Sequence, residues 1–275
     1  MFKKVKFSDG RREIYIGKKK VFEYVRTTEL ARFLSKIYAK LSENDFSTST
    51  QSQALVAKLC GGWGSFYDFL FLLNRAYVAP KYHKIFYDFY LRKERGERLV
   101  FVDGGCHNGV FADIALACGG LCHAFEPNAY LCAFLRNLYK NNAAFILHEA
   151  AISTQDGETI FYDESDENAV GQGGSVVQWA FDGQRVGYKV RLMDFCEFVK
   201  SLAAQHGKIN LVKIDIEGAE FEVLDALLER NLHENIEYLM VETHERFFAD
   251  PAAKLAALKN KIAEKNAKNV YLDWV

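Results

Sequence analysis

The sequence predicts an α/β fold in which a doubly wound, mostly parallel sheet follows an N-terminal helical extension. From residue 98 onward, apolar runs of strand length alternate with segments of helical periodicity, glycine turns separate them, and acidic residues follow several of the runs. A chain of 275 residues, 49% hydrophobic and 26% charged, is long enough to bury such a sheet. We expect an extension over 1–96 and a sheet domain over 97–275.

The extension is predicted to be a basic hairpin followed by helices. The hairpin turns near Asp9-Gly10, and Thr27-Thr28 can cap the first helix. A polar linker over 42–53 precedes a second helical stretch, and further helices are expected over 65–78 and 80–95. Their aromatic residues recur at helical spacing, which is more typical of packing than of base stacking. We interpret these helices as a cap or a dimer element.

The sheet domain is predicted from six apolar runs. They lie near 98–103, 121–126, 145–149, 210–215, 237–243 and 269–274. An insertion over 154–189 interrupts the alternation and contains a hairpin segment at Thr159–Tyr162 and a glycine-rich stretch. Such an insertion is typical of a loop that closes over a substrate.

The turn after the first run carries the most specific pattern. Its spacing, Asp-x-Gly-x-x-x-Gly, differs from the Gly-x-Gly-x-x-Gly of dinucleotide-binding turns, and a carboxylate precedes it. Asp103 can meet the ammonium of an amino-acid tail, which S-adenosylmethionine has and a dinucleotide lacks. Gly105 and Gly109 are expected to let a cofactor approach the backbone. The turn therefore favours S-adenosylmethionine as the cofactor.

A second carboxylate follows at the distance expected for a ribose contact. Glu126 ends the next strand about 20 residues after the turn, where a carboxylate accepts hydrogen bonds from both ribose hydroxyls. Pro127 and Asn128 start the following helix. The alternative is an acid that only complements the helix N-terminus. With Asp103 upstream, the ribose role is favoured.

Two further strands end in groups suited to proton transfer. Asp215, Glu217 and Glu220 follow the fourth run, although Glu217 and Glu220 also suit a helix start. Glu242 and His244 follow the fifth run beside them, and His244 is a candidate general base whose alternative is a structural role. Asp215, Glu217, Glu242 or His244 could also hold magnesium. The sequence does not choose between these mechanisms, and we favour one without an essential metal.

The acceptor atom is predicted to be oxygen. Enzymes that methylate exocyclic amines of nucleobases commonly carry an Asn/Asp-Pro-Pro-aromatic motif after the fourth strand, and this chain has three prolines, none adjacent. His107, inside the glycine turn, either faces the substrate or hydrogen-bonds locally, and both interpretations stay open.

Together these segments resemble the FkbM-type methyltransferases. The matching residues are Val102-Asp103-Gly104-Gly105, Asn108-Gly109, Ala124-Phe125-Glu126-Pro127, Lys213-Ile214-Asp215-Ile216-Glu217-Gly218-Ala219-Glu220 and Val241-Glu242-Thr243-His244, within 98–248. The resemblance implies a Rossmann-like methyltransferase sheet and S-adenosylmethionine-dependent O-methylation, often of sugars, glycans or polyketide-type products. It implies cofactor contacts at Asp103, Gly105 and Glu126, with Glu149 and Ala150 near the adenine. We expect Asn108, Gly109 and Pro127 to belong to the same cofactor site. Cys106-His107 departs from the small or aliphatic residues usual in the family.

Composition limits the partners and the compartment. The net charge of −1 gives no attraction to polyanions, although basic residues crowd the start: Lys3, Lys4, Lys6, Arg11, Arg12, Lys18, Lys19 and Lys20. No Cys-x-x-Cys pair, signal peptide or long apolar run occurs, so we expect a cytoplasmic protein without a zinc site or membrane span. We expect a small-molecule or glycan acceptor with a free hydroxyl. The alternatives are an RNA-modifying or nucleic-acid-binding protein that uses the basic start, which we do not favour, and a dinucleotide-dependent oxidoreductase. A homodimer through the N-terminal helices stays open.

Overall fold

The computed structural model describes residues 2–6, 11–16, 18–25, 50–162, 174–177 and 187–274. The helix predicted after Thr27-Thr28 lies outside the described residues, as does most of the predicted polar linker. The part of that linker that is described belongs to a helix, because α2 (Thr50–Leu59) already begins at residue 50.

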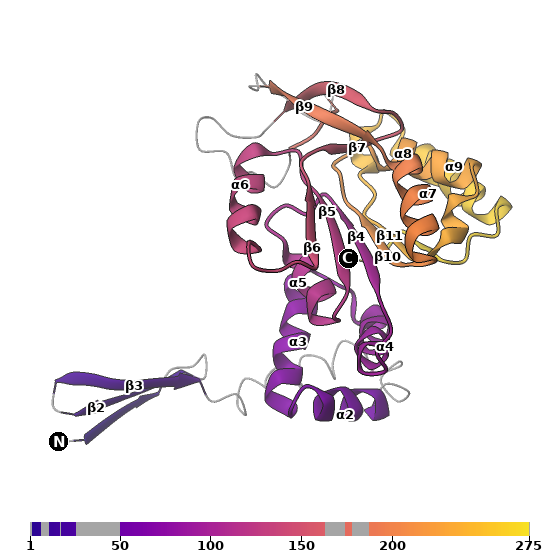
Figure 1. Cartoon of the computed structure of the whole chain (residues 1–275). Coiled ribbons are helices and arrows are strands. Elements are labelled where there is room, and N and C mark those ends of the chain that lie inside the picture. The colour runs from indigo at the N-terminus through magenta and orange to yellow at the C-terminus, as the bar shows by residue number, and fades with distance from the viewer. Residues whose placement is uncertain are drawn as a thin grey trace.

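A six-stranded parallel sheet forms the centre of the described structure (Figure 1). Its strands, in spatial order, are β12 (Val270–Tyr271), β11 (Ile236–Val241), β10 (Ile209–Ile214), β4 (Val100–Gly104), β5 (Leu121–Phe125) and β6 (Phe145–His148). The predicted fold class is confirmed, and every expected run contains a strand. The last strand is shorter than predicted, since only two residues of 269–274 pair with β11.

The strand order reverses between β4 and β10, and this position defines where a ligand is expected. Along the chain the sheet grows from β4 through β5 to β6, and then from β10 through β11 to β12 on the other side. Ligands of such sheets bind beyond the carboxyl ends of the strands at this switch. The register brings Asp103 beside Lys213 and Ile214 beside Val241, so the ends of β4, β10 and β11 lie together.

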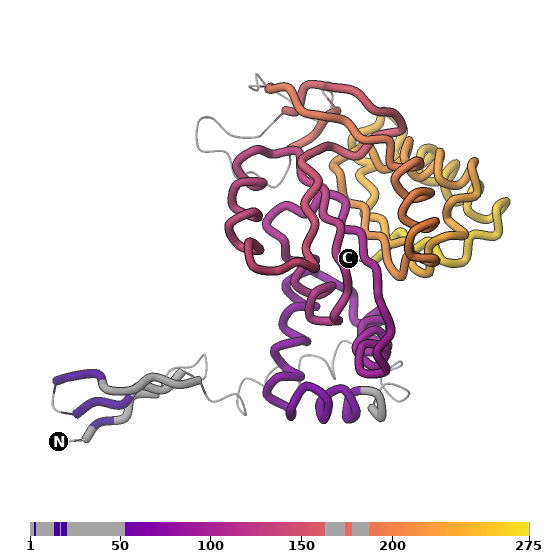
Figure 2. The backbone as a smooth tube through the Cα atoms, in the orientation of Figure 1, coloured from indigo at the N-terminus to yellow at the C-terminus, as the bar shows by residue number. Residues whose placement is uncertain are grey.

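Helices cover both faces of the sheet (Figures 1 and 2). One core joins the sheet to α2, α3 (Trp63–Arg75), α4 (His83–Glu94) and α5 (Val110–Ala117). The other joins it to α7 (Phe195–His206), α8 (Glu220–Glu229) and α9 (Pro251–Glu264). Successive strand residues alternate between the two cores: Phe101 faces the first and Val102 the second. Residues 50–94 thus share a core with the sheet, and a domain boundary at residue 96 stays a prediction.

The N-terminal helices differ from the prediction mainly at their ends. Helix α3 ends three residues before the predicted 78, and the predicted helix over 80–95 is a 3₁₀ turn at Pro80–Tyr82 followed by α4. In the basic start, β1 (Phe2–Lys6) and β2 (Arg11–Ile16) pair antiparallel as the hairpin prediction requires. A third strand, β3 (Lys19–Val25), pairs with β2 and was not predicted.

The insertion and the residues that flank it form a small sheet, which lies above the central sheet in Figure 1. Its strands are β7 (Ala151–Ser153), β9 (Gly187–Asp194) and β8 (Gly157–Tyr162), in this spatial order. The prediction of a hairpin at Thr159–Tyr162 was wrong, because these residues belong to the single strand β8, which pairs antiparallel with β9 on the far side of the glycine-rich stretch. Local turn signals do not report a pairing between segments so distant in sequence.

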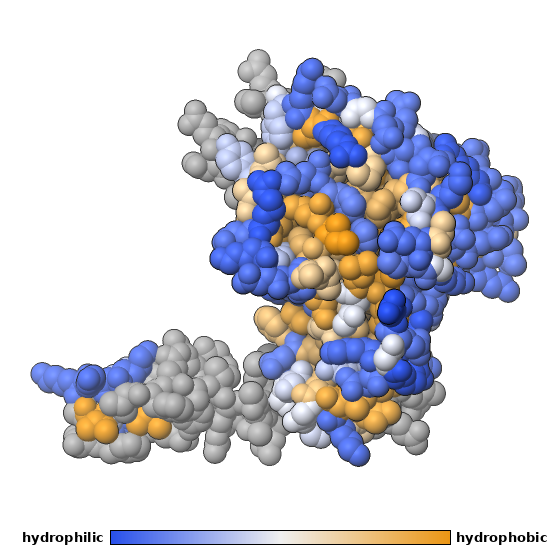
Figure 3. Space-filling view, in the orientation of Figure 1, coloured by the Kyte–Doolittle hydropathy of each residue, from blue (hydrophilic) through white to orange (hydrophobic). Residues whose placement is uncertain are grey.

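The surface is predominantly polar over the side formed by α7 and α9, while apolar residues reach the surface near the centre of the molecule (Figure 3). Among the described residues, no helix combines the length and the apolar character needed to cross a membrane.

Candidate active site

The glycine turn after β4 is held in a left-handed backbone conformation at three residues. Gly105, His107 and Gly109 have φ angles of +73°, +47° and +84°. A Cβ atom on Gly105 would lie 1.8 Å from the carbonyl oxygen of Asp215, and one on Gly109 would lie 2.5 Å from the hydroxyl of Tyr139. Glycine is required here because the neighbouring strand end and helix approach the turn. The predicted approach of a cofactor to these glycines stays a prediction.

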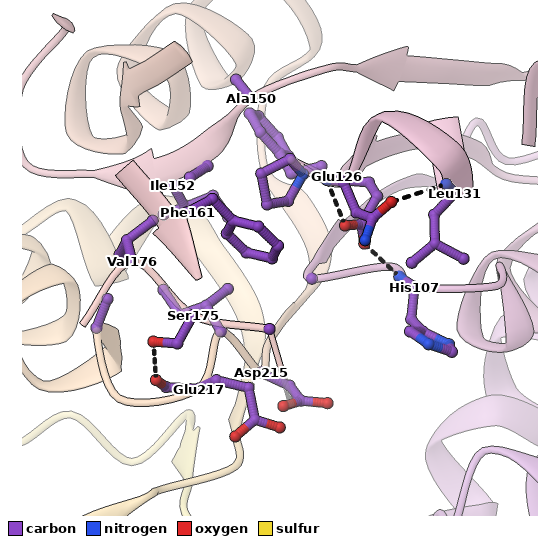
Figure 4. Close-up of a pocket in the computed structure, with 18 residues that line it drawn as sticks. His107, Glu126, Leu131, Ala150, Ile152, Phe161, Ser175, Val176, Asp215 and Glu217 are labelled. Atoms are coloured by element: carbon purple, nitrogen blue, oxygen red, sulfur yellow. Dashed lines mark hydrogen bonds between the residues drawn. The ribbon is translucent and has the colours of Figure 1, made fainter. Parts of the chain in front are cut away.

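Glu126 fastens the end of β5 to the glycine turn. Its Oε2 accepts a hydrogen bond from the backbone N–H of His107 at 2.8 Å, and its Oε1 accepts one from Asn128 at 2.9 Å (Figure 4). Burial raises the pKa of Glu126 to about 7. Asn128 is the N-cap of α6 (Ala129–Leu138), as its position predicted, and accepts from two N–H groups of the first turn.

Asp103 lies beneath the turn and not on its surface. Its carboxylate is fully buried, and Lys213 Nζ lies 3.4 Å from its Oδ1 and 3.3 Å from Asp215 Oδ2. Lys213 also donates to the carbonyls of Gly105 and Gly104, at 2.7 and 3.2 Å. Burial raises the pKa of Asp103. Burial alone would lower the pKa of Lys213, but the charges of Asp215 and Asp103 outweigh the burial and raise this pKa. Asp103 is thus linked to the turn indirectly: it pairs with Lys213, and Lys213 donates to the carbonyls of the turn.

Two cavities open at the carboxyl end of the sheet, and the first is largely apolar (Figure 4). It contains about 660 Å³ of space, part of it open to solvent. Its apolar walls are Phe125, Leu131, Ala150, Ile152, Phe161 and Val176. Glu126, Pro127 and Asn128 form one polar side. Ala150 thus lies in this cavity, whereas Glu149 points away and pairs with Arg136.

The second cavity is lined mainly by charged and polar groups. They come from the sheet end, from the end of α3 and from the C-terminal segment: Arg75, Tyr77, Asn108, Lys213, Glu242, His244, Arg246 and Trp274. Four residues line both cavities: Gly105, His107, Asp215 and Glu217. Of the predicted site residues, Asp103, Gly109 and Glu149 line neither.

His244 lies at the centre of a ring of carboxylates. Its side chain is 1% exposed, and its Nδ1 is hydrogen-bonded to Glu220, which is 0% exposed. Its Nε2 lies 3.3 Å from Glu217 Oε2, 3.9 Å from Asp215 Oδ1 and 3.9 Å from Glu242 Oε1. The structure therefore brings together three of the four predicted catalytic residues, His244, Asp215 and Glu242. The fourth, His107, also lines the second cavity.

The pKa values of Glu217, Glu242 and His244 in this ring are all raised. Burial raises the pKa of Glu217 to about 7, and the Asp215 charge adds to the shift. Burial, again with Asp215, raises the pKa of Glu242. For His244, burial alone would lower the pKa, but the hydrogen bond to Glu220 and the nearby carboxylates raise it. Each of these groups holds a proton at a higher pH than it would in water.

The insertion contributes to the first cavity through Ser175. Its hydroxyl, in a residue 1% exposed, donates to the Glu217 carbonyl at 2.6 Å and accepts from Val177 N–H at 2.9 Å. Phe161 and Val176 of the insertion line the cavity beside it (Figure 4). This segment therefore covers the first cavity and is tied to the end of β10.

Several of these residues escaped prediction. Lys213 is not among the predicted site residues, yet a lysine in a strand expected to be buried signals a paired charge. Glu220 was interpreted as a helix-start acid at least as readily as a catalytic one. Ser175, Arg75, Tyr77 and Trp274 carry no signal at their positions in sequence, because only the tertiary fold brings them to the cavities.

Comparison with known families gives one match. Residues 103–264, more than half of the chain, match the family described as the methyltransferase FkbM domain. The matched region begins at the end of β4 and includes the glycine turn, Glu126 and the ring around His244. A search of curated proteins found no match.

Proposed function

The chain belongs to the FkbM methyltransferase family, and from this premise we propose that it transfers a methyl group from S-adenosylmethionine to a hydroxyl oxygen of a sugar, glycan or related natural product. The observation that carries this proposal is the wall shared by the two cavities, formed by Gly105, His107, Asp215 and Glu217. A methyl donor and its acceptor must meet in line, and adjoining cavities with a common wall allow this.

The first cavity suits the nucleoside part of the cofactor. Each Glu126 oxygen accepts one backbone N–H, which leaves about two of the carboxylate's four acceptor positions for a pair of hydroxyl donors. The apolar walls beside it, including Phe125 and Ala150, suit a flat heterocycle. When bound, S-adenosylmethionine supplies an electrophilic methyl group and is left as a neutral thioether.

The amino-acid tail of the cofactor would lie toward the shared wall. We assign Asp103 a positioning role in this part of the site, since it holds Lys213 and Lys213 holds the carbonyls of Gly104 and Gly105. Asp215 lines both cavities, and we expect an ammonium to meet its Oδ2, which leaves Oδ1 on the side of His244.

The second cavity suits a polyhydroxyl acceptor. Its carboxylates and cationic groups offer acceptors and donors to hydroxyls, and Tyr77 and Trp274 add aromatic surface. Arg75 and Tyr77 come from the end of α3, so we assign residues of the N-terminal part to the acceptor side. An alcohol becomes a competent nucleophile when its proton is removed, and Glu242 lines only this cavity. We therefore assign Glu242 as the group that accepts the hydroxyl proton.

The test combines binding with product analysis on the full chain. Isothermal titration with S-adenosylhomocysteine should show one site per chain. Tritium-labelled S-adenosylmethionine should then label members of a panel of nucleotide sugars and oligosaccharides, with mass spectrometry locating the methyl group on oxygen. Absence of S-adenosylhomocysteine binding would overturn the cofactor assignment. A methyl group found on nitrogen or carbon would overturn the O-methyl assignment.

A nucleic-acid acceptor is the second candidate, and the exposed lysines of the three-stranded sheet support it. Lys3, Lys18, Lys19 and Lys20 are exposed there. Phosphate contacts by such residues would give an RNA affinity that falls steeply with salt. Labelling of RNA in the same assay, lost above physiological salt, would favour this candidate over the glycan.

A further inference from the structure

We propose that the ring around His244 is a binding site for one divalent first-row transition-metal ion, held by His244 Nε2, Asp215 Oδ1 and Glu217 Oε2. The candidate ligand atoms of these three residues all lie within 4.8 Å of one another. They lie within three residues after the ends of two neighbouring parallel strands, β10 and β11, and line the second cavity. The two paired strands fix where these short segments begin.

The orientation of the imidazole is that of a metal ligand. Glu220, fully buried, is bonded to Nδ1 and also accepts from the N–H of Gly218 at 2.8 Å. A carboxylate at Nδ1 fixes the tautomer that carries its proton on this nitrogen. The Nε2 lone pair then points into the ring of carboxylates. A carboxylate behind a histidine in this way is the usual support of metal-bound imidazole.

The distances within the ring suit an ion with little movement. Bonds of about 2.0–2.2 Å to one ion separate neighbouring ligand atoms by about 3.0–3.5 Å. Nε2 lies 3.3 Å from Glu217 Oε2 and 3.9 Å from Asp215 Oδ1. Small rotations of the Asp215 and Glu217 side chains would bring the three ligand atoms, which lie within 4.8 Å of one another, to these separations. The second cavity leaves the remaining coordination positions open to a substrate or water.

The local charge also favours a cation. Four carboxylates, those of Asp215, Glu217, Glu220 and Glu242, surround His244. Of the nearby cations, Lys213 is shared between Asp215 and the buried Asp103, and Arg246 is 61% exposed and 3.7 Å from Glu217. Like charges held this closely repel strongly, and a divalent ion among them removes that repulsion.

The mixed ligand set narrows the class of ion. Magnesium and calcium prefer oxygen ligands, whereas imidazole suits the transition metals and carboxylate suits Mn²⁺ as well. One imidazole with two carboxylates therefore points to an ion such as Mn²⁺, and Mg²⁺ is expected to bind more weakly.

The role of the ion rests on the proposed function. An acceptor hydroxyl bound to it would have a lower pKa, so that its O–H bond breaks with the proton passing to Glu242 and the electron pair staying on oxygen. Glu242 Oε1, 3.9 Å from Nε2, lies beside the ligands. The deprotonated hydroxyl oxygen of the acceptor would then accept the methyl group.

The experiment measures the ion itself. Full-length protein, freed of metal with a chelator and exchanged into metal-free buffer, is titrated with MnCl₂ while electron paramagnetic resonance counts free and bound Mn²⁺. We expect one bound ion per chain. Glu217→Gln, which removes a ligand charge, and Glu220→Gln, which removes the support of His244, should each weaken binding by about 10–100-fold. MgCl₂ should displace Mn²⁺ only in large excess.

Glu234→Gln is the matched control. Glu234 is an exposed acid before β11, at the opposite end of the strand, so its variant should bind Mn²⁺ as the unchanged protein does. Absence of bound Mn²⁺ would overturn the proposal, as would equal binding by the Glu217 and Glu234 variants when both melt as the parent does.

Failure of this site and failure of the proposed function give different results. S-adenosylhomocysteine binding without Mn²⁺ binding would reject the metal site and leave the methyltransferase cofactor assignment standing. Mn²⁺ binding that Glu217→Gln weakens, without S-adenosylhomocysteine binding, would support the metal site and reject the cofactor assignment.

Discussion

The two cavities at the end of the sheet differ in chemistry although they share a wall. The first has mainly apolar walls, with Glu126 on one polar side and the shared wall on another, and residues of the insertion line it. The second is lined by charged groups around His244 and is bounded partly by the end of α3. The two cavities share part of the backbone at the strand switch but have different linings. In the proposed function, this difference separates the binding of the nucleoside from the activation of the acceptor.

The largest expected effect belongs to the second cavity alone. Glu242→Gln keeps the size of the side chain but removes its ability to accept a proton. We expect the rate of methyl transfer at saturating substrate to fall by about 100–10,000-fold, as for loss of a general base. Binding of S-adenosylhomocysteine, measured by titration, should stay within about threefold of the parent. Comparable loss of binding and rate would mean that the cavities do not divide the work as proposed.

The next effect should be confined to the first cavity. Glu126→Gln removes the charge that we expect the ribose hydroxyls to meet, and hydrogen bonds to charged groups contribute about 1.5–3 kcal/mol. S-adenosylhomocysteine should therefore bind about 10–100-fold more weakly.

Mn²⁺ binding to the Glu126 variant provides the internal control. It should be unchanged, because Glu126 lines only the first cavity. An unchanged affinity for S-adenosylhomocysteine in a variant that melts normally would remove Glu126 from the cofactor site.

The sequence predicted the strand ends far better than what lies between them. Asp215, Glu242 and His244 could be placed together because parallel strands end at one edge and their order in the chain is readable. Asp103 was expected to meet the ammonium of the cofactor, but it is fully buried and pairs with Lys213, a neighbour that only the strand order of β4 and β10 supplies.

The insertion shows which contacts the sequence could not predict. Its strand β8 was recognised, but its partner β9 follows a long glycine-rich stretch, and no local pattern reports such a pairing. Ser175 could not be assigned for the same reason. The contribution of Arg75 to the second cavity likewise depends on how α3 packs against α5 and the sheet.

The next prediction concerns the pH dependence of stability, which we expect from the imidazoles of His123 and His148 near the first cavity. His123 Nδ1 and His148 Nε2 lie 3.0 Å apart beneath the first cavity, where His148 stacks on Phe125. Burial lowers the pKa of each to about 4, opposite in direction to His244.

Because the folded state binds these protons less readily than the unfolded state, their contribution to stability is complete above about pH 6.5 and is lost as the pH falls toward 4. As the pH falls from about 6.5 to 4, we expect these two histidines to lower the free energy of unfolding by about 2 kcal/mol, after allowance for their coupling and partial exposure. Chemical denaturation at a series of pH values measures it. His148→Phe keeps the stacking and should flatten the profile, and an equally steep profile in that variant would assign the loss to other groups.

The smallest effect should come from the connection between the insertion and the shared wall. Ser175→Ala removes a hydroxyl that donates to the Glu217 carbonyl and accepts from Val177. A neutral hydrogen bond contributes about 0.5–1.5 kcal/mol, so the KM for S-adenosylmethionine should rise by about 2–12-fold. The kcat should change less, because Glu242 and His244 are not touched. Ser201→Ala, at an exposed position of α7, is the control and should leave both constants unchanged. A fall in kcat with an unchanged KM would instead place Ser175 on the acceptor side of the wall, where its hold on the Glu217 backbone would set the position of that carboxylate.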